Sequence, residues 1–267
     1  MSLHGLETRK EINDRLLHVM NHYEVLPKLI EECKPYLDSQ FDIELKNEPY
    51  ARLFELVICK NLLNHSDYLI LEHAKNKPKK SPDFFIKSIE GKPCRIWIEC
   101  VTSSFSKIEK KQKNMEEVIL RLTGSIKSKH DIIMDVYRKS NADGPVIGHS
   151  DKVILALCSG GAGNDFLDLR DIILGKPYAI FDPDDHSSNL EINHKPYTIT
   201  KNNQRKSKVK IGGEDLIEIV KQFDGIIHMR PIPLLTGHSH PFDFMPCDFI
   251  DLKKIFNWTP PYIPKVS

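Results

Sequence analysis

The sequence lacks several features that would place a protein quickly in a large class. No apolar run approaches the ~20 residues that span a bilayer, and residues 1–13 lack the apolar stretch of a secretory signal. The formal net charge is only +1, so any surface that attracts nucleic acid must be local. The six cysteines form no CxxC pair, which predicts free thiols in a cytoplasmic protein.

Motifs of several common active sites are also missing. No GxSxG nucleophile elbow occurs, and the glycine-rich segment 159–163 has neither the Gly-Lys-Ser/Thr ending of a Walker loop nor a GxGxxG pattern. We interpret that segment as a strand-to-helix turn. His238 and His240, with Cys247 downstream, provide too few ligands at regular spacing to indicate a zinc site.

What the sequence does contain is the pattern of an α/β protein. Its 267 residues, 40% hydrophobic and 28% charged, suit one large domain. Helices come first, then a β-hairpin, then alternating strand and helix, which predicts a mixed β-sheet flanked by helices. We expect a single domain over residues 1–267, with an N-terminal helical segment at about 1–45 and an irregular C-terminal extension at about 231–267.

The central part of the chain predicts the elements that carry the candidate site. Residues 83–89 and 95–102 are typical of two strands, joined by a hairpin-like turn around residues 90–93. A long helix is expected over 114–139, followed by a buried strand over 152–158. The antiparallel hairpin would bring the start of its first strand beside the end of its second.

Two carboxylates lie at that shared end. Asp83 opens the first strand, and Glu99 sits inside the apolar run of the second, on the same face as Trp97 and Val101. Two converging carboxylates repel each other, and a divalent cation resolves the repulsion. Oxygen ligands favour Mg²⁺ or Mn²⁺, and such an ion could assist the hydrolysis of a phosphodiester. A turn aspartate is the alternative reading of Asp83.

A third carboxylate, Glu55, occurs in a helix predicted over residues 49–64, which is apolar on most faces. An ionised side chain there is costly unless it is paired or binds a metal. A salt bridge to Arg52 or Lys60 is the structural alternative to a role in catalysis.

These residues resemble the motif of a known superfamily. A glutamate in a helix (Glu55), a Pro-Asp pair opening a strand (Pro82-Asp83) and a glutamate ending the paired strand (Glu99) are similar to the PD-(D/E)xK nucleases. The strings Ser-Pro-Asp-Phe and Ile-Trp-Ile-Glu-Cys-Val-Thr also resemble an uncharacterised bacterial subgroup, over roughly residues 49–161. The resemblance implies a restriction-endonuclease-like fold, with Asp83 and Glu99 as metal ligands.

The chain departs from that motif at one position. The superfamily's lysine would fall at residue 101, where this chain has Val101. The long helix can supply a replacement, because Arg121, Ser125 and Lys129 share a face at i, i+4 and i+8. Lys129 is the predicted relocated ammonium and Arg121 a phosphate or carboxylate partner. Lys127 lies off that face and is the other candidate; an ordinary exposed helix is the alternative.

Basic residues cluster in three stretches, at 75–80, 107–113 and 201–210. The first directly precedes Pro82-Asp83, so Lys79 and Lys80 are predicted to contact backbone phosphates. Charge runs are also common on solvated surfaces, which is the alternative interpretation. No recognition-helix module and no interleaved aromatic residues appear.

The expectation from sequence is therefore a Mg²⁺- or Mn²⁺-dependent nuclease that hydrolyses DNA, with Glu55, Asp83, Glu99 and Lys129 in its active site. RNA is left open as a substrate, and a homodimer is possible although no dimer motif is visible. No membrane partner is expected. The alternative is a catalytically inactive protein with the nuclease fold, which would act as a nucleic-acid-binding or interaction module. Val101 is the residue that favours this alternative.

Overall fold

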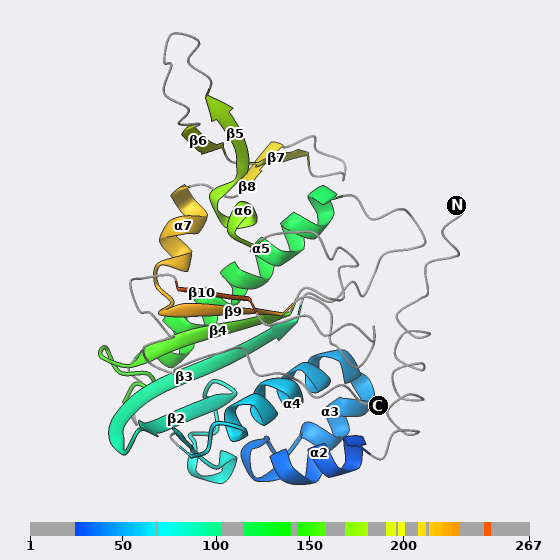
Figure 1. Cartoon of the computed structure of the whole chain (residues 1–267), viewed down its shortest axis with the longest axis vertical. Coiled ribbons are helices and arrows are strands. Elements are labelled where there is room, and N and C mark those ends of the chain that lie inside the picture. Colours follow the sequence, from blue (N-terminus) through cyan, green and yellow to red (C-terminus); the bar gives the residue numbers. More distant parts are fainter. Residues whose placement is uncertain are drawn as a thin grey trace, which may run out of the picture.

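The structure is a computed structural model that describes residues 25–67, 69–102, 115–139, 144–158, 169–180, 191–195, 197–200, 208–211, 214–229 and 243–246. Within them the chain forms an α/β fold around a mixed, open β-sheet (Figure 1). The strands lie in the order β1-β2-β3-β4-β9, with the short β10 beside β9. Their bounds are β1 Leu69–Leu71, β2 Phe84–Ile89, β3 Lys92–Thr102, β4 Lys152–Cys158, β9 Gly225–Met229 and β10 Asp243–Pro246.

The centre of the sheet is parallel and its edges are antiparallel. Strand β3 pairs in parallel with β4, and β4 pairs in parallel with β9. The pairs β1–β2, β2–β3 and β9–β10 are antiparallel. Strands β4 and β9 and residues 96–100 of β3 are mostly apolar and almost wholly buried, as expected for strands covered on both faces.

One face of the sheet packs against the N-terminal helices α2 (Val25–Cys33), α3 (Phe41–Asn47) and α4 (Pro49–Leu63), with the 3₁₀ turn η1 (Lys34–Tyr36) between α2 and α3 (Figure 1). Helix α4 starts at a proline, a residue well suited to a first helical turn. Its apolar side chains, including Phe54 and Ile58, share a core with Ile98 and Cys100 of β3. Helix α3 ends at Asn47, so only Glu48 separates α3 from α4.

The other face packs against α5 (Met115–Ile132), α6 (Leu169–Leu174) and α7 (Glu214–Val220) (Figure 1). Ile119, Leu122 and Ile126 of α5 share a second core with Trp97 of β3 and Leu155 of β4. Residues alternate between the two cores along β3, as strand geometry requires. Glu99 has the parity of Trp97 and therefore faces α5.

The hairpin between β2 and β3 turns at Glu90 and Gly91, whose φ angles are 50° and 72°. Positive φ at both central residues is the geometry of a type I′ turn, which matches the twist of the flanking strands. The register pairs Phe84 with Ile98 and Phe85 with Trp97. The predicted hairpin is confirmed, although β3 begins at Lys92 rather than at residue 95.

The long helix expected over 114–139 is also confirmed, but its last turn is not α-helical. After Ile132 the chain forms a π-helical turn, η3 (Ile133–Tyr137), closed by a bond from the Arg138 amide to the Ile133 carbonyl oxygen. π-Turns often occur near functional sites, because the extra residue redirects side chains. Among the described residues, no helix is both long enough and apolar enough to cross a membrane.

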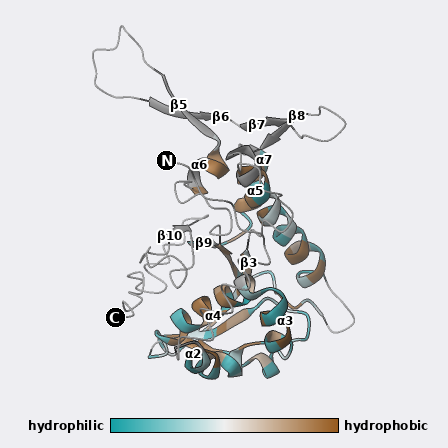
Figure 2. Ribbon diagram, turned by 90° about the vertical axis from the view of Figure 1, so that its right-hand side faces the viewer, coloured by the Kyte–Doolittle hydropathy of each residue, from teal (hydrophilic) through white to brown (hydrophobic). Residues whose placement is uncertain are grey.

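Two ribbons of paired strands lie beyond the sheet (Figure 1), at the end of the molecule away from α2–α4, which Figure 2 shows from the side. One pairs β5 (Lys176–Ile180) with β6 (Glu191–Lys195), and the other pairs β7 (Tyr197–Thr200) with β8 (Lys208–Ile211). Strands β6, β7 and β8 were not predicted. Strand β10 also falls inside the extension expected to be irregular at 231–267, which corrects that expectation for residues 243–246.

Candidate active site

Asp83 and Glu99 lie next to each other at one end of the β2–β3 hairpin. They flank the rung that pairs Phe84 with Ile98, with Asp83 just before β2 and Glu99 near the end of β3. Asp83 Oδ2 accepts a hydrogen bond of 2.6 Å from the amide of Cys100, the residue after Glu99. The hairpin thus fixes the backbone positions from which both carboxylates project.

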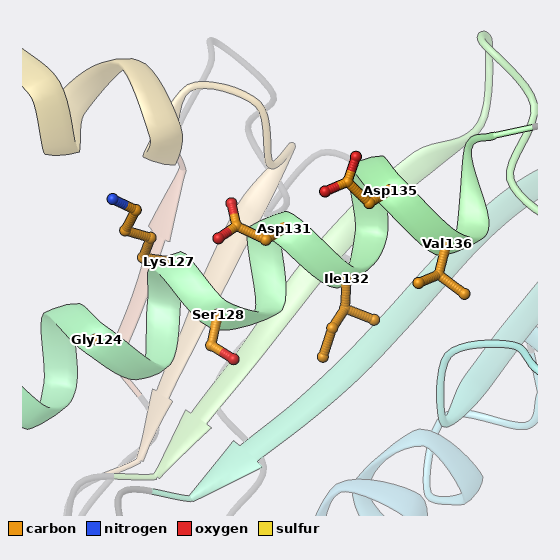
Figure 3. A pocket seen from close by; sticks show the side chains of 7 residues that line it. All are labelled: Gly124, Lys127, Ser128, Asp131, Ile132, Asp135 and Val136. Carbon is orange, nitrogen blue, oxygen red and sulfur yellow. The ribbon is translucent and has the colours of Figure 1, made fainter.

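Lys129 of α5 reaches this pair from the facing helix. Its ammonium bonds Glu99 Oε1, and only 4% of the Glu99 side chain is exposed. Lys127 does not approach the pair: it is exposed and borders a shallow hollow on the outer side of α5, near Asp131 and Asp135 (Figure 3). Of the two candidate lysines, Lys129 is therefore the one that contacts the carboxylates.

Glu55 lies on α4, one of the helices on the opposite side of the sheet from α5. Its Oε2 accepts a bond of 2.5 Å from Arg52, so the predicted alternative of a salt bridge to Arg52 is confirmed. Lys60 pairs instead with Glu32. Arg52 also bonds Asp38 and Glu44, so one guanidinium binds three carboxylates. Glu55 nevertheless lines the same cleft as Asp83.

The pKa values of two carboxyl groups near the site, Glu99 and Glu55, are raised. Burial and the nearby charge of Asp83 raise the pKa of Glu99 to about 7, although Lys129 opposes the shift. Burial and Asp83 likewise raise the pKa of Glu55 to about 8, against the effect of Arg52. Both glutamates resist ionisation mainly because they are buried, and the charge of Asp83 adds to the effect. A bound cation would favour their ionised forms.

The same carboxylates affect the pKa values of two neighbouring side chains, Cys100 and Tyr137. Burial, with the charges of Asp83 and the two glutamates, raises the pKa of the Cys100 thiol far above its usual range, so this cysteine is a poor nucleophile. Burial and the charges of Glu99 and Asp83 also raise the pKa of the Tyr137 phenol. The π-turn therefore places Tyr137 within electrostatic reach of the site.

Lys77 is a site residue that the sequence pattern did not single out. Its half-buried ammonium donates to the carbonyl oxygens of Pro82 (3.1 Å) and Asp83. Burial lowers the pKa of Lys77, while the charge of Asp83 opposes that effect. In the sequence Lys77 is one of four lysines between residues 75 and 80, and nothing in the run distinguishes it from its exposed neighbours.

Two hollows lie near the site, and the larger one borders Asp83 and Glu55. The smaller, of about 300 Å³, lies between the end of β3 and α5, and its lining includes Val101, Arg121, Ser125 and Lys129. The predicted helix face of Arg121, Ser125 and Lys129 is thus confirmed as a shared surface. The larger, of about 840 Å³, has Asp83, Glu55 and Lys77 in its lining.

The three residues predicted to contact phosphates, Lys79, Lys80 and Arg121, lie in different surroundings. Lys79 and Lys80 are exposed in the loop before β2, and Lys79 borders the larger hollow. Arg121 is half-buried in the smaller one. The basic stretch 107–113, the glycine-rich segment 159–163 and His238, His240 and Cys247 lie outside the described residues. The cysteines at 33, 59, 94, 100 and 158 are free, as predicted.

The donor set available for a metal is small. Within the described ranges, no three Asp, Glu, His or Cys side chains lie together as a metal cluster. Asp83 and Glu99 offer carboxylate oxygens alone. This suits Mg²⁺, which keeps several of its waters and often binds through one or two carboxylates. It does not suit a structural zinc ion, which needs four ligands.

Comparisons with protein-family models, with curated proteins and with solved structures found no match. The function of the site must therefore be argued from its own chemistry.

A second buried carboxylate near β3 provides an internal reference. Asp151, just before β4, accepts hydrogen bonds from Arg95 Nε (2.7 Å), Trp97 Nε1 (2.8 Å) and the Gly148 amide (3.0 Å). We call these four residues the Asp151 clasp. Burial alone would raise the pKa of Asp151, but these donors lower it below its usual value. The clasp is electrostatically satisfied, in contrast to the Asp83–Glu99 pair.

Proposed function

We propose that this protein is a metal-dependent nuclease that hydrolyses phosphodiester bonds in DNA, built on a restriction-endonuclease-like core. The observation that carries the proposal is the Lys129–Glu99 contact beside Asp83. It joins two converging carboxylates and an ammonium from three separate elements, a combination suited to phosphoryl transfer. Val101 borders the same hollow as Lys129, so the ammonium comes close to the strand position from which the usual lysine is missing.

Each residue has a distinct proposed role. Asp83 and Glu99 hold Mg²⁺ or Mn²⁺, and the bound ion supplies charge neutralisation at the phosphate and a more acidic water. Lys129 orients the attacking water and keeps Glu99 in place. Glu55 orients water on the Asp83 side, with Arg52 holding its carboxylate. Arg121, Lys79 and Lys80 contact neighbouring phosphates, which positions the strand without reading its sequence.

The elevated pKa values support this assignment. Strongly shifted pKa values cluster at functional sites. Glu99 at about 7 and Glu55 at about 8 both show such a shift in the metal-free protein. A cation between the carboxylates would favour their ionised forms, so its binding should release protons near neutral pH.

A second candidate is a binding module that keeps the fold without catalysis. Two observations favour it. Lys129 already forms an ion pair with Glu99, and among the described residues only two carboxylates, not three, are available to bind a metal. In that case Lys129 would be a permanent substitute for the metal, and the protein would bind nucleic acid without cutting it.

The test is a cleavage assay with single-stranded and duplex DNA, with Mg²⁺ or Mn²⁺ and with chelator. The proposal predicts metal-dependent cleavage that Asp83→Asn lowers by about 10³-fold or more. The matched control is Asp151→Asn, the same change in a buried aspartate away from the site, which should retain the activity per folded molecule. Equal activity of the Asp83→Asn and wild-type proteins would contradict the assignment.

A further inference from the structure

The larger hollow, which borders Asp83 and Glu55, differs from the smaller one in its size and location. It lies between the η1 region of the N-terminal helices and the η2 segment (Ala74–Asn76) with the loop that precedes β2. We call it the N-terminal cleft. Its volume of about 840 Å³ is that of a pocket for a small organic ligand, which ranges over roughly 300–1,000 Å³. One or two nucleotides fit such a space, whereas a duplex does not.

The N-terminal cleft is lined by charges of both signs, with Asp83 among its carboxylates. The carboxylates Asp38, Glu44 and Glu55 in its lining are all ion-paired with Arg52. The exposed lysines in the lining, by contrast, make no ion pair within the part of the chain that the structure describes; they are Lys34, Lys75 and Lys79. The lysines are therefore left to attract a phosphate backbone.

Lys77 connects this cleft to the carboxylates. Two of its three ammonium donors bond the carbonyl oxygens of Pro82 and Asp83, and one is left for a group in the cleft. Because the lining also includes Asp83, a phosphate bound by Lys77 would lie next to the proposed scissile position.

An aromatic pair completes the lining. The rings of Tyr36 and His73 meet edge to face, with centroids 5.0 Å apart and an interplanar angle of 86°. Both side chains are half-buried, and both border the N-terminal cleft. Aromatic side chains beside a basic groove are the means by which single-stranded nucleic acids are bound, because every base can stack on a ring.

We propose that the N-terminal cleft binds an unpaired nucleotide of the substrate strand, with its base against Tyr36 and His73 and its phosphate at Lys77. The inference rests on the proposed nuclease function and specifies its substrate class: single-stranded nucleic acid, or a strand end that is free of its complement. The bases of an intact duplex are paired and stacked, and they cannot enter a pocket of this size.

Binding can be tested separately from cleavage. In the full-length Asp83→Asn variant, the dissociation constants of a labelled single strand of about 12 nucleotides and of the matching blunt duplex are measured by fluorescence anisotropy. The proposal predicts at least about 10-fold tighter binding of the single strand. Adding Tyr36→Ala should weaken single-strand binding by about 5- to 100-fold and leave duplex binding nearly unchanged. Tyr36→Phe, which keeps the ring, is the matched control.

Two results would overturn the inference. One is equal or tighter binding of the duplex, and the other is a Tyr36→Ala variant with the parent's melting temperature and the parent's single-strand affinity. If Tyr36→Ala does not fold, photocrosslinking of a single strand carrying 5-iododeoxyuridine to the Asp83→Asn protein replaces it. Crosslinks at Tyr36 or His73 support the inference, and crosslinks confined to other residues overturn it.

The outcomes also separate this inference from the nuclease proposal. A wild-type protein that cleaves only duplex DNA would refute the inference and leave the nuclease function intact. A protein that binds single strands through Tyr36 without any metal-dependent cleavage would refute the nuclease function instead.

Discussion

Two buried carboxylates lie toward opposite ends of strand β3 and are in opposite electrostatic states: Asp151, which precedes β4, and Glu99 of β3. At one end the Asp151 clasp supplies three hydrogen-bond donors, and the pKa of Asp151 is lowered. At the other end, burial and the neighbouring Asp83 raise the pKa of Glu99 to about 7, against the effect of its partner Lys129. A carboxylate that serves the fold is satisfied by its neighbours, whereas one at a functional site is often left in need of a ligand.

The two regions also differ in which elements of the fold supply their charged groups. The Asp151 clasp draws its donors from adjacent segments, β3 and the turn before β4, and it ties two strands together. The Asp83–Glu99 site gathers charged groups from the β2–β3 hairpin, from α4 and from α5, which pack on opposite faces of the sheet. Charges of both signs therefore converge at this site: Lys129 borders the smaller hollow, and Asp83, Glu55 and Lys77 line the larger one.

The largest expected effect concerns the lysine of the site. Lys129→Met removes the ammonium that contacts Glu99, and we expect the rate of metal-dependent DNA cleavage to fall by about 10³-fold. Lys127→Met, two residues away on the outer side of α5, should leave the rate unchanged. Single-turnover assays of the folded proteins measure both. Similar losses in the two variants would mean that Lys129 acts through general charge and not through its contact with Glu99.

A carboxylate-to-amide change should have opposite effects on stability in the two regions. Asp151→Asn replaces a carboxylate oxygen with an NH₂ group that faces the N–H groups of Arg95, Trp97 and Gly148, so hydrogen bonds are lost. The free energy of unfolding should fall by about 2 kcal/mol. Glu55→Gln removes a buried charge that resists ionisation and should raise the free energy of unfolding by about 1 kcal/mol near pH 8. Urea denaturation without divalent cations measures both. A loss of stability in Glu55→Gln as large as in Asp151→Asn would break the distinction.

The two regions should also differ in their pH dependence. Glu99 and Glu55 have folded pKa values of about 7 and 8, above the usual value of 4.5, so the native state binds more protons than the unfolded state between those limits. Stability of the metal-free protein should therefore fall by on the order of 2 kcal/mol from about pH 5 to about pH 8. Asp151, with its lowered pKa, adds stability that persists across this range and is lost only as the pH falls below its usual value. Denaturation curves at several pH values provide the measurement, and stability that rises toward pH 8 would contradict the account.

The smallest expected effect belongs to the exposed lysines. Lys79→Ala and Lys80→Ala should each weaken DNA binding only a few-fold and reduce the slope of log affinity against log salt by about 1. Lys152→Ala, near the Asp151 clasp, is the matched control and should leave the slope unchanged. Affinities measured at several salt concentrations decide the matter. An unchanged slope in Lys79→Ala and Lys80→Ala would remove both residues from the nucleic-acid interface.

The sequence predicted much of the fold because its central elements carry strong local patterns. The buried strand β4 and helix α4 agree with the predicted segments to within a residue. Strands β6 to β8 were missed because each is only four or five residues long, too short for an alternation of apolar and polar positions to stand out. The π-turn at the end of α5 also left no signal, because an extra residue in one turn hardly changes the helical period.

The site was predictable where spacing determines position and not where packing does. The hairpin register brought Asp83 beside Glu99, and the period of α5 set Lys129 and Arg121 on one face. The burial of Lys77 and the convergence of Arg52 on three carboxylates depend on contacts between distant segments. The N-terminal cleft likewise arises where η1 and η2 approach each other, and no local pattern encodes that approach.

The central claim is that the Asp83–Glu99 end of β3 is a cation site, whereas the Asp151 end is not. Titration of Mn²⁺ into the full-length protein near pH 8, followed by electron paramagnetic resonance, tests it most directly. The account predicts saturable Mn²⁺ binding that Asp83→Asn and Glu99→Gln abolish and Asp151→Asn preserves. Mn²⁺ binding that survives Asp83→Asn and Glu99→Gln, or a wild-type protein that binds no Mn²⁺, would contradict it.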